Sequence, residues 1–118
     1  MIVDLQELAG KIDRATASLM AETTALCTAN MLLGVAEMEL QDAENKVVLI
    51  NSIDPKALGS NEQIRQANIR IQTDKQCRKV TAEKTSVLEA KGKLAVSELV
   101  MSNYKMMLKI AELERVKE

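Results

Sequence analysis

The stretch LMAETTALCTANMLLGVAEMEL, residues 19–40, decides the fold, because a leucine stands in it at every seventh position. The same spacing continues outward on both sides, and a second set of mostly small residues follows three positions after the first. A seven-residue repeat of this length is typical of a long helix that packs along another helix. Position a of the repeat is Leu5, Ile12, Leu19, Leu26, Leu33, Leu40 and Val47, and position d is Leu8, Ala15, Glu22, Ala29, Ala36, Ala43 and Ile50.

The composition of the chain favours the same all-α architecture. Its 118 residues are enough for one domain, and they include a single aromatic residue, Tyr104, with no Trp, Phe or His. Aromatic side chains fill much of the core of most globular folds. A core of Leu, Ala, Val and Met is therefore expected, as in helix pairs and bundles. Four glycines and one proline also give too few turn signals for a fold of many short strands.

The stretch NSIDPKALGSNEQ, residues 51–63, is predicted to end the first helix. The residue before Pro55 is disfavoured in the α conformation, and Gly59 suits a left-handed turn. Ser60 is a candidate N-cap, and Gln63 completes a capping box with it. These signals predict a helix over about residues 3–52, a loop over 53–60, a short helix over about 61–72 and a last helix over about 75–117.

The last helix carries a second seven-residue repeat. The stretch QTDK, residues 72–75, is expected to interrupt the chain before it, because Thr73 or Asp74 can cap a new helix. Two helices of this kind, joined by a short connection, fold back antiparallel, and alternating large and small residues let them approach closely. Residues 1–53 carry a net charge of −5 and residues 54–118 a net charge of +4, which favours this pairing. In the last helix, position a is Val80, Val87, Leu94, Met101 and Leu108, and position d is Glu83, Ala90, Ser97, Tyr104 and Ala111; the a and d residues of both helices form the predicted seam of the hairpin.

Other apolar residues stand at heptad positions that point away from this seam. An isolated hairpin would expose them to water, and a contiguous apolar surface usually marks an interface. A two-helix hairpin also buries little surface by itself. The pattern therefore predicts a hairpin that self-associates into a dimer or larger helical bundle. We call the predicted contact residues the outer apolar residues; they are Met20, Cys27, Met31, Met38, Val96, Leu99, Met106, Ile110 and Leu113.

The sequence offers no catalytic constellation. Without His there is no Ser-His-Asp triad, no HExxH zinc site and no Glu-x-x-His di-iron site, and the scattered glycines form no phosphate-binding loop. The acidic residues between Glu37 and Glu44 could attract a hard cation, and the Met and Cys residues a soft metal. A solvated helix face and adaptable packing explain both groups more simply. We predict a non-enzymatic protein without metal or cofactor.

A cluster of basic residues near the connection suggests an alternative function. Lys and Arg side chains bind phosphates in a salt-dependent, sequence-independent way, although the chain has no aromatic residues to stack on bases. Pairing of these basic side chains with the acidic residues at 37–44 is the structural alternative. The candidate nucleic-acid contacts are Arg65, Arg70, Lys75, Arg78 and Lys79.

Residues 58–65, with the sequence LGSNEQIR, fit the pattern L-G-x-N-E-x-x-R between two long helices. This layout resembles small helical-hairpin proteins encoded by phages and prophages, whose function is unknown. The resemblance implies an accessory protein of a virus or mobile element in a host cytoplasm, with no enzymatic activity. In the motif itself, Ser60 or Asn61 is expected to cap a helix, and Glu62 and Arg65 are spaced to form an ion pair.

The expected location is a reducing cytoplasm. Cys27 and Cys77 are 50 residues apart and match no metal or redox spacing, which favours reduced thiols. The first residues contain acidic side chains and no apolar core of a secretory signal. Polar residues interrupt the apolar stretch at 19–40, and no basic residues flank it closely, so we expect no membrane span. The expected partners are further copies of the chain and an unidentified protein.

Overall fold

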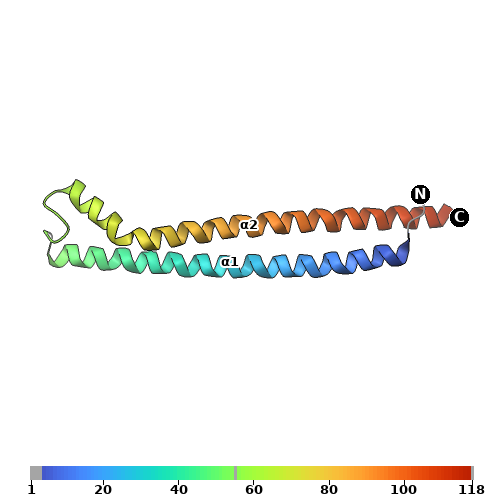
Figure 1. The fold of residues 1–118 in the computed structure, drawn as a ribbon, viewed down its shortest axis with the longest axis horizontal. Helices are drawn as coiled ribbons and strands as arrows, with labels where there is room; N and C mark the ends of the chain where they lie inside the picture. The colour runs from blue at the N-terminus through green and yellow to red at the C-terminus, as the bar shows by residue number, and fades with distance from the viewer. Residues whose placement is uncertain (1–3, 55, 118) are drawn as a thin grey trace. The chain divides into compact units, whose positions relative to one another are not determined.

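The computed structural model describes residues 4–54 and 56–117 and consists of two long α-helices. Helix α1 runs over Leu5–Ile53 and helix α2 over Glu62–Lys117, and no strand occurs among the described residues. The predicted all-α helical hairpin is confirmed (Figure 1). The structure divides into two compact units. Unit 1 contains residues up to Thr28 and from Leu88 onward, and unit 2 is Ala29–Val87.

In each unit, α1 and α2 run antiparallel and bury residues of the predicted seam. In unit 1 the buried residues are Leu8, Ala15, Ala90, Met101 and Ala111, and in unit 2 they include Ala29, Ala36, Val47, Val80 and Val87. Alanine at position d, as at Ala36 with 1% of its surface exposed, lets two helix axes approach closely. The remaining seam residues are half-buried, except two that the structure leaves exposed, Leu5 and Ile50.

The two exposed seam residues lie near the ends of α1. Leu5 is the first residue of the helix and is 40% exposed, and Ile50, one turn before the end, is 43% exposed. The prediction that they belong to the buried seam is therefore wrong. A fully buried side chain needs several packing neighbours, and at a helix end it has them on only one side along the axis, so the burial produced by the repeat decreases there.

The short separate helix predicted at 61–72 is not present, because α2 continues through the expected break. The Thr73 hydroxyl does not cap a new helix. It donates to the carbonyl of Ile69, four residues earlier, at 2.9 Å, and Asp74 pairs with Arg78 at 2.9 Å. Counting back seven residues from Val80, Thr73 occupies position a, and only 3% of its surface is exposed. The heptad repeat of α2 therefore begins before residue 75.

The first turns of α2 are inclined to the turns that follow them (Figure 1). The Thr73 hydroxyl makes a contact of the kind that can bend a helix, but Thr16 and Thr81, among others, make the same contact, so this contact alone does not account for the inclination. The backbone changes direction without interrupting its helical hydrogen bonds.

Side-chain caps and a left-handed glycine build the connection between the helices. Asp54 accepts the backbone N–H of Lys56 at 3.1 Å, and Gly59 has a φ of 138°. Of the two predicted caps, Ser60 and Asn61, it is Asn61 that caps α2: its side-chain oxygen accepts the N–H of Ile64 at 2.9 Å. The capping box proposed for Ser60 and Gln63 is therefore wrong: the helix begins at Glu62, and Ile64, three residues after the cap, has no side-chain acceptor to complete a box.

A buried leucine anchors the connection to α2. Leu58 is 1% exposed, and its carbonyl accepts a hydrogen bond from the side-chain amide of Asn68. Glu62 and Arg65 form the expected ion pair, at 3.1 Å. Residues of the stretch LGSNEQIR, 58–65, thus have local structural roles in the turn, the cap and the first turn of the helix.

We expect Gly59→Ala to destabilise the protein by about 1–3 kcal/mol. Gly59 has a positive φ that disfavours a side chain, and a Cβ built there would lie 2.3 Å from Cγ2 of Ile64. The matched control is Gly34→Ala in α1, where a Cβ meets nothing within 4 Å and helix propensity improves. Urea unfolding of both variants measures the difference. A Gly59→Ala variant as stable as the wild type would contradict this description of the turn.

Candidate interaction surfaces

The outer apolar residues are exposed where the structure places them. On α1, Met20, Met31 and Met38 expose 67%, 73% and 69% of their surface, and Cys27 is also exposed. The five members on α2, which are Val96, Leu99, Met106, Ile110 and Leu113, are 46–66% exposed. Large apolar side chains at this exposure are typical of surfaces that another molecule covers.

The structure distributes these nine residues over both units. Met31 and Met38 belong to unit 2, and the other seven belong to unit 1. Unit 1 therefore carries apolar residues on the outer side of both of its helix segments. The two methionines of unit 2 stand three and four residues from Val35, which is itself 49% exposed, so they are part of an exposed strip on α1.

The sequence reasoning missed further exposed apolar residues beside the predicted ones. Leu32 and Val35 on α1 are 50% and 49% exposed, and Leu88 on α2 is 68% exposed. Val100 and Met107 are less exposed, at 37% and 38%. Leu32, Val100 and Met107 occupy position g, beside the seam, and Val35 and Leu88 occupy positions c and b, which were considered only on the other helix. The spacing of four residues from Met31 to Val35 and of three from Leu32 to Val35 was the available signal.

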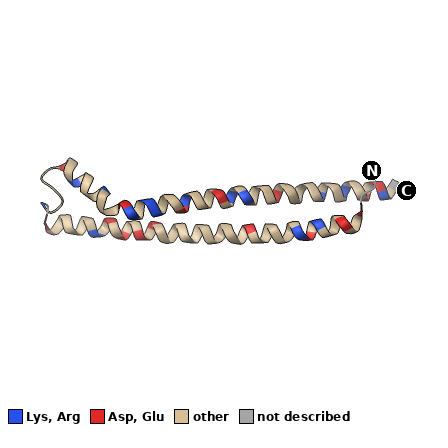
Figure 2. Ribbon diagram, in the orientation of Figure 1, with Lys and Arg blue, Asp and Glu red and all other residues tan. Residues whose placement is uncertain are grey.

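The middle of α1 is long and nearly uncharged. Between Arg14 and Glu37 the only charged residue is Glu22, and Figure 2 shows this stretch as one red turn in an otherwise tan helix. An 18-residue window of α1, with a mean hydropathy of 1.3, is long and apolar enough to cross a membrane, and 11% of that window is buried. Only the length and composition of the window support a membrane span, and a helix that is covered by other protein meets the same two criteria.

Three of the five candidate nucleic-acid contacts are paired with carboxylates. Lys79 of α2 contacts Glu39 of α1 at 2.8 Å, so one of the expected pairs with the acidic residues of the first helix is present. Arg65 and Arg78 instead pair with acidic residues of α2 itself. Among the described residues, Arg70 and Lys75 have no ion-pair partner. The basic cluster is thus largely neutralised within the hairpin.

The surface ion pairs shift the pKa values of two groups. The hydrogen bond and charge of Glu39 raise the pKa of Lys79, so the stabilisation from this pair is present at neutral pH and is lost as pH rises through the raised pKa. Hydrogen bonds from Gln66 and Arg65 lower the pKa of Glu62. That contribution is present above the ordinary pKa of a glutamate and disappears as pH falls through the lowered value. Both groups are solvated, so both effects are small.

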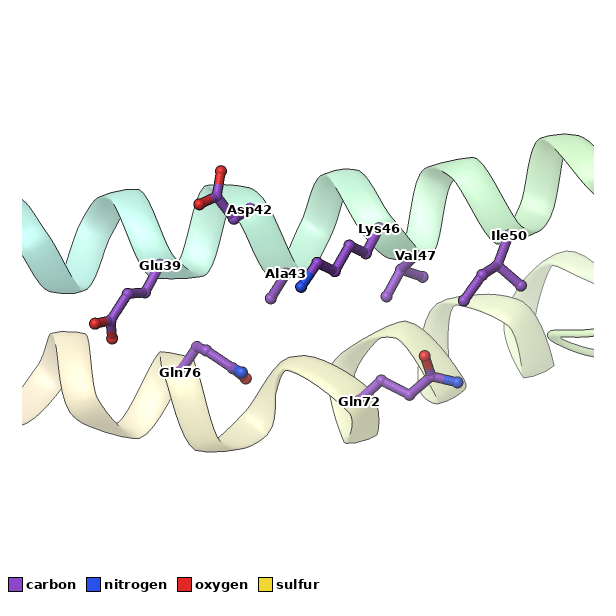
Figure 3. A pocket seen from close by; sticks show the side chains of 8 residues that line it. All are labelled: Glu39, Asp42, Ala43, Lys46, Val47, Ile50, Gln72 and Gln76. Atoms are coloured by element: carbon purple, nitrogen blue, oxygen red, sulfur yellow. The ribbon is translucent and has the colours of Figure 1, made fainter.

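A groove lies between the helices of unit 2 beside the Lys79–Glu39 pair. Its polar lining consists of two carboxylates, one ammonium group and two amides (Figure 3). Hard cations prefer oxygen ligands, but no group of three or more His, Cys, Asp or Glu that could hold a metal occurs among the described residues. In this groove, polar Gln76 of α2 stands at position d of the seam, and exposed Gln72 lies one turn before it. It is lined by Glu39, Asp42, Ala43, Lys46, Val47, Ile50, Gln72 and Gln76.

We expect Gln76→Leu to stabilise the hairpin by about 1 kcal/mol or more. Gln76 stands at position d of the repeat, and its buried side-chain oxygen has no hydrogen-bond partner among the described residues. Leucine has a similar volume and no polar atom to leave unpaired. The control is Gln72→Leu at the neighbouring exposed position, which should change the melting temperature little. A lower melting temperature for Gln76→Leu would show that the amide is satisfied in solution.

Both cysteines, Cys27 and Cys77, are free thiols and exposed. Comparison of the chain with models of protein families, with curated proteins and with solved structures finds no match.

Proposed function

We propose that this protein is a non-enzymatic interaction protein whose hairpins self-associate through their exposed apolar faces. The observation that carries the proposal is the exposure of large apolar side chains at the outer positions of both helices, from Met20 to Leu113. Burying one Leu, Ile, Val or Met side chain contributes about 1.5–3 kcal/mol. Covering several of them at once is enough to drive association of two hairpins.

A second copy of the hairpin fits these faces better than a bilayer does. In unit 1, the α2 segment that packs with the apolar part of α1 carries Lys91, Lys93 and Glu98, all exposed. Insertion of the hairpin would bring these charges into hydrocarbon, at a cost of about 2.5–3.5 kcal/mol for a Lys or Asp at the centre of a bilayer. Association in water covers the apolar residues and leaves the charges solvated.

The proposed location is the cytoplasm of a cell, which is a host cell if the chain is viral. Free, exposed thiols at Cys27 and Cys77 suit a reducing compartment. The resemblance of residues 58–65 to phage and prophage proteins supports an accessory role in such a cell. In this role the hairpin presents surfaces to other proteins and carries out no chemistry.

The experiment that tests self-association compares Met31→Lys with Asn30→Lys. Both residues are exposed on α1, but Met31 stands at heptad position f among apolar residues, whereas Asn30 stands at position e, where Thr23 and Glu37 are also polar. Light scattering after gel filtration should give a smaller mass for Met31→Lys, with unchanged helix content by circular dichroism. Asn30→Lys should keep the mass of the wild type. Equal masses for all three proteins would remove the α1 face from the interface.

A second candidate function is binding of nucleic acid by the basic residues near the connection. The observation that favours it is the pair Arg70 and Lys75, both exposed and without an ion-pair partner among the described residues. Two free cations provide few phosphate contacts, so binding should be weak and strongly reduced by salt.

We expect the protein to elute from a heparin column at about 50 mM salt, with no specific retention. The matched test is a double variant, Arg70→Glu with Lys75→Glu, which removes the unpaired cations and leaves the Lys79–Glu39 contact in place. If the wild type is retained well above this salt concentration and the double variant is not, the nucleic-acid function becomes the better account.

A further inference from the structure

Besides its seam repeat, helix α2 carries another seven-residue repeat, on the side opposite the hairpin seam. Starting at residue 96, apolar residues recur at alternating steps of three and four, with a single asparagine among them. The apolar members are 46–66% exposed and Asn103 is exposed as well. We call this set the second seam; it consists of Val96, Leu99, Asn103, Met106, Ile110 and Leu113.

The residue types of the second seam indicate the partner that it fits. In the heptad frame of this seam, position a is Val96, Asn103 and Ile110, and position d holds Leu99, Met106 and Leu113. β-branched residues at a with leucine at d favour two-stranded parallel coiled coils, and one polar Asn at an a position fixes register and oligomer state. The occupant that matches this pattern is a second copy of α2.

We propose that two copies of this chain pair through their second seams, with their α2 helices parallel and in register. This inference rests on the proposed self-association and gives it an orientation. Each α2 then packs on two sides, with α1 of its own chain on the seam and with α2 of the partner copy on the second seam. The dimer contains four helices, and its two α2 helices are the inner ones. The outer apolar residues of α1, such as Met31, lie on the outside of this dimer and are left for a further contact between dimers.

Asn103 favours the parallel orientation over the antiparallel one. In a parallel, in-register pair, Asn103 lies beside Asn103 of the partner copy, and the two amides can hydrogen-bond to each other. In an antiparallel pair centred on the second seam, Val96 faces Leu113 of the partner copy and Asn103 faces its Met106. The buried amide would then have no partner, which is unfavourable.

The charges beside the second seam are complementary in the parallel orientation. Lys109 precedes an a residue and Glu114 follows a d residue, five positions later, which is the spacing of an ion pair between parallel strands. Both residues are exposed, and neither has an ion-pair partner within the described part of the chain. The dimer would contain two such pairs, each between Lys109 of one copy and Glu114 of the other.

Disulfide trapping tests the orientation directly. The full chain with Cys27→Ser and Cys77→Ser provides a background without native thiols, into which Val96→Cys is introduced. In the parallel dimer the two new thiols lie in one layer of the seam. In the antiparallel one they are separated by 17 residues, or about 25 Å along the helix, too far for a disulfide. The control is Glu98→Cys, exposed and outside the second seam.

In a glutathione redox buffer, we expect most Val96→Cys protein to become a covalent dimer and the Glu98→Cys control to stay uncrosslinked. If Val96→Cys does not cross-link while light scattering still shows a dimer, the orientation is wrong and self-association stands. A mixed disulfide between Val96→Cys and Leu113→Cys proteins would identify the antiparallel pair. A wild-type protein that is monomeric by light scattering would overturn both proposals.

Replacing the asparagine gives an independent measurement. Asn103→Val fills the a position with an apolar residue, so the assembly should tighten, with at least a tenfold lower dissociation constant, and lose its preference for one register and one mass. Helix content should not change, because Asn103 is exposed in the hairpin. Unchanged or weaker association would show that Asn103 lies outside the interface.

Discussion

Val87→Asp unfolds the hairpin. Val87 stands at position a of the seam in α2 and is 6% exposed. The substitution removes an apolar contact and buries a carboxylate, and none of the described basic residues is buried in the seam to pair with it. An unpaired buried charge costs about 3–5 kcal/mol, and a small domain has about 5–15 kcal/mol of stability in total. Circular dichroism at 25 °C should show loss of most of the helical signal, or a melting temperature lowered by tens of degrees.

The adjacent residue provides the control for this prediction. Leu88 is larger than Val87 and is 68% exposed, so Leu88→Asp puts the same charge one position later on the outside of the helix. We expect it to keep the helical signal and to unfold at nearly the temperature of the wild type. If both variants behave alike, the seam is not the source of the stability of the hairpin.

Leu99→Lys dissociates the assembly while leaving each hairpin folded. Leu99 is 66% exposed in the single chain, so its loss costs the hairpin little. In a symmetric dimer the change occurs twice, and each copy loses about 1.5–3 kcal/mol of apolar burial and gains a charge in an apolar contact. These losses correspond to at least a hundredfold weaker dissociation constant, which sedimentation velocity over a concentration series can measure.

The conservative substitution Leu99→Met separates this effect from a general disturbance of α2. It keeps the apolar volume and should change the dissociation constant by less than tenfold. The helix content of both variants should equal that of the wild type, since Leu99 lies outside the hairpin seam. A Leu99→Lys protein that still associates like the wild type would contradict the assignment of the second seam.

The repeat at Leu19, Leu26, Leu33 and Leu40 was sufficient to predict the two long helices and their antiparallel pairing. The period of seven residues fixes which side of each helix is buried, and NSIDPKALGSNEQ contains strong stop and start signals. These features are local in the sequence and depend little on contacts with distant residues, so they could be predicted with the turn at nearly the right place.

The sequence predicts a break near Thr73, but the helix is continuous there. The sequence alone could not decide this, because a Thr hydroxyl has two possible local partners. It can cap a new helix or donate to the carbonyl four residues back. The choice depends on burial at position a of the repeat, where Thr73 is 3% exposed. The same holds for Asn61 and Ser60, which are both suitable caps by type. Packing of Leu58 and the conformation of Gly59 place the helix start at Glu62.

The candidate surfaces could be predicted only in part. Outward heptad positions identify exposed apolar residues such as Met31, but they do not say which of them form one continuous strip. The pairing of Lys79 with Glu39 followed from opposite charges on the two halves of the chain. The local pairs that neutralise Arg65 and Arg78 depend on spacings of three and four residues in α2. The Glu62–Arg65 pair was predicted from its spacing, and the Asp74–Arg78 pair was missed because Asp74 was considered as a cap.

The most direct test of the central claim is the solution mass of the wild-type chain, measured by light scattering after gel filtration across a concentration series. The chain mass is 13.0 kDa. If the outer apolar residues are covered by further copies, the mass at low micromolar concentration is at least twice this value and decreases only on strong dilution. A mass of 13.0 kDa at every concentration would contradict self-association.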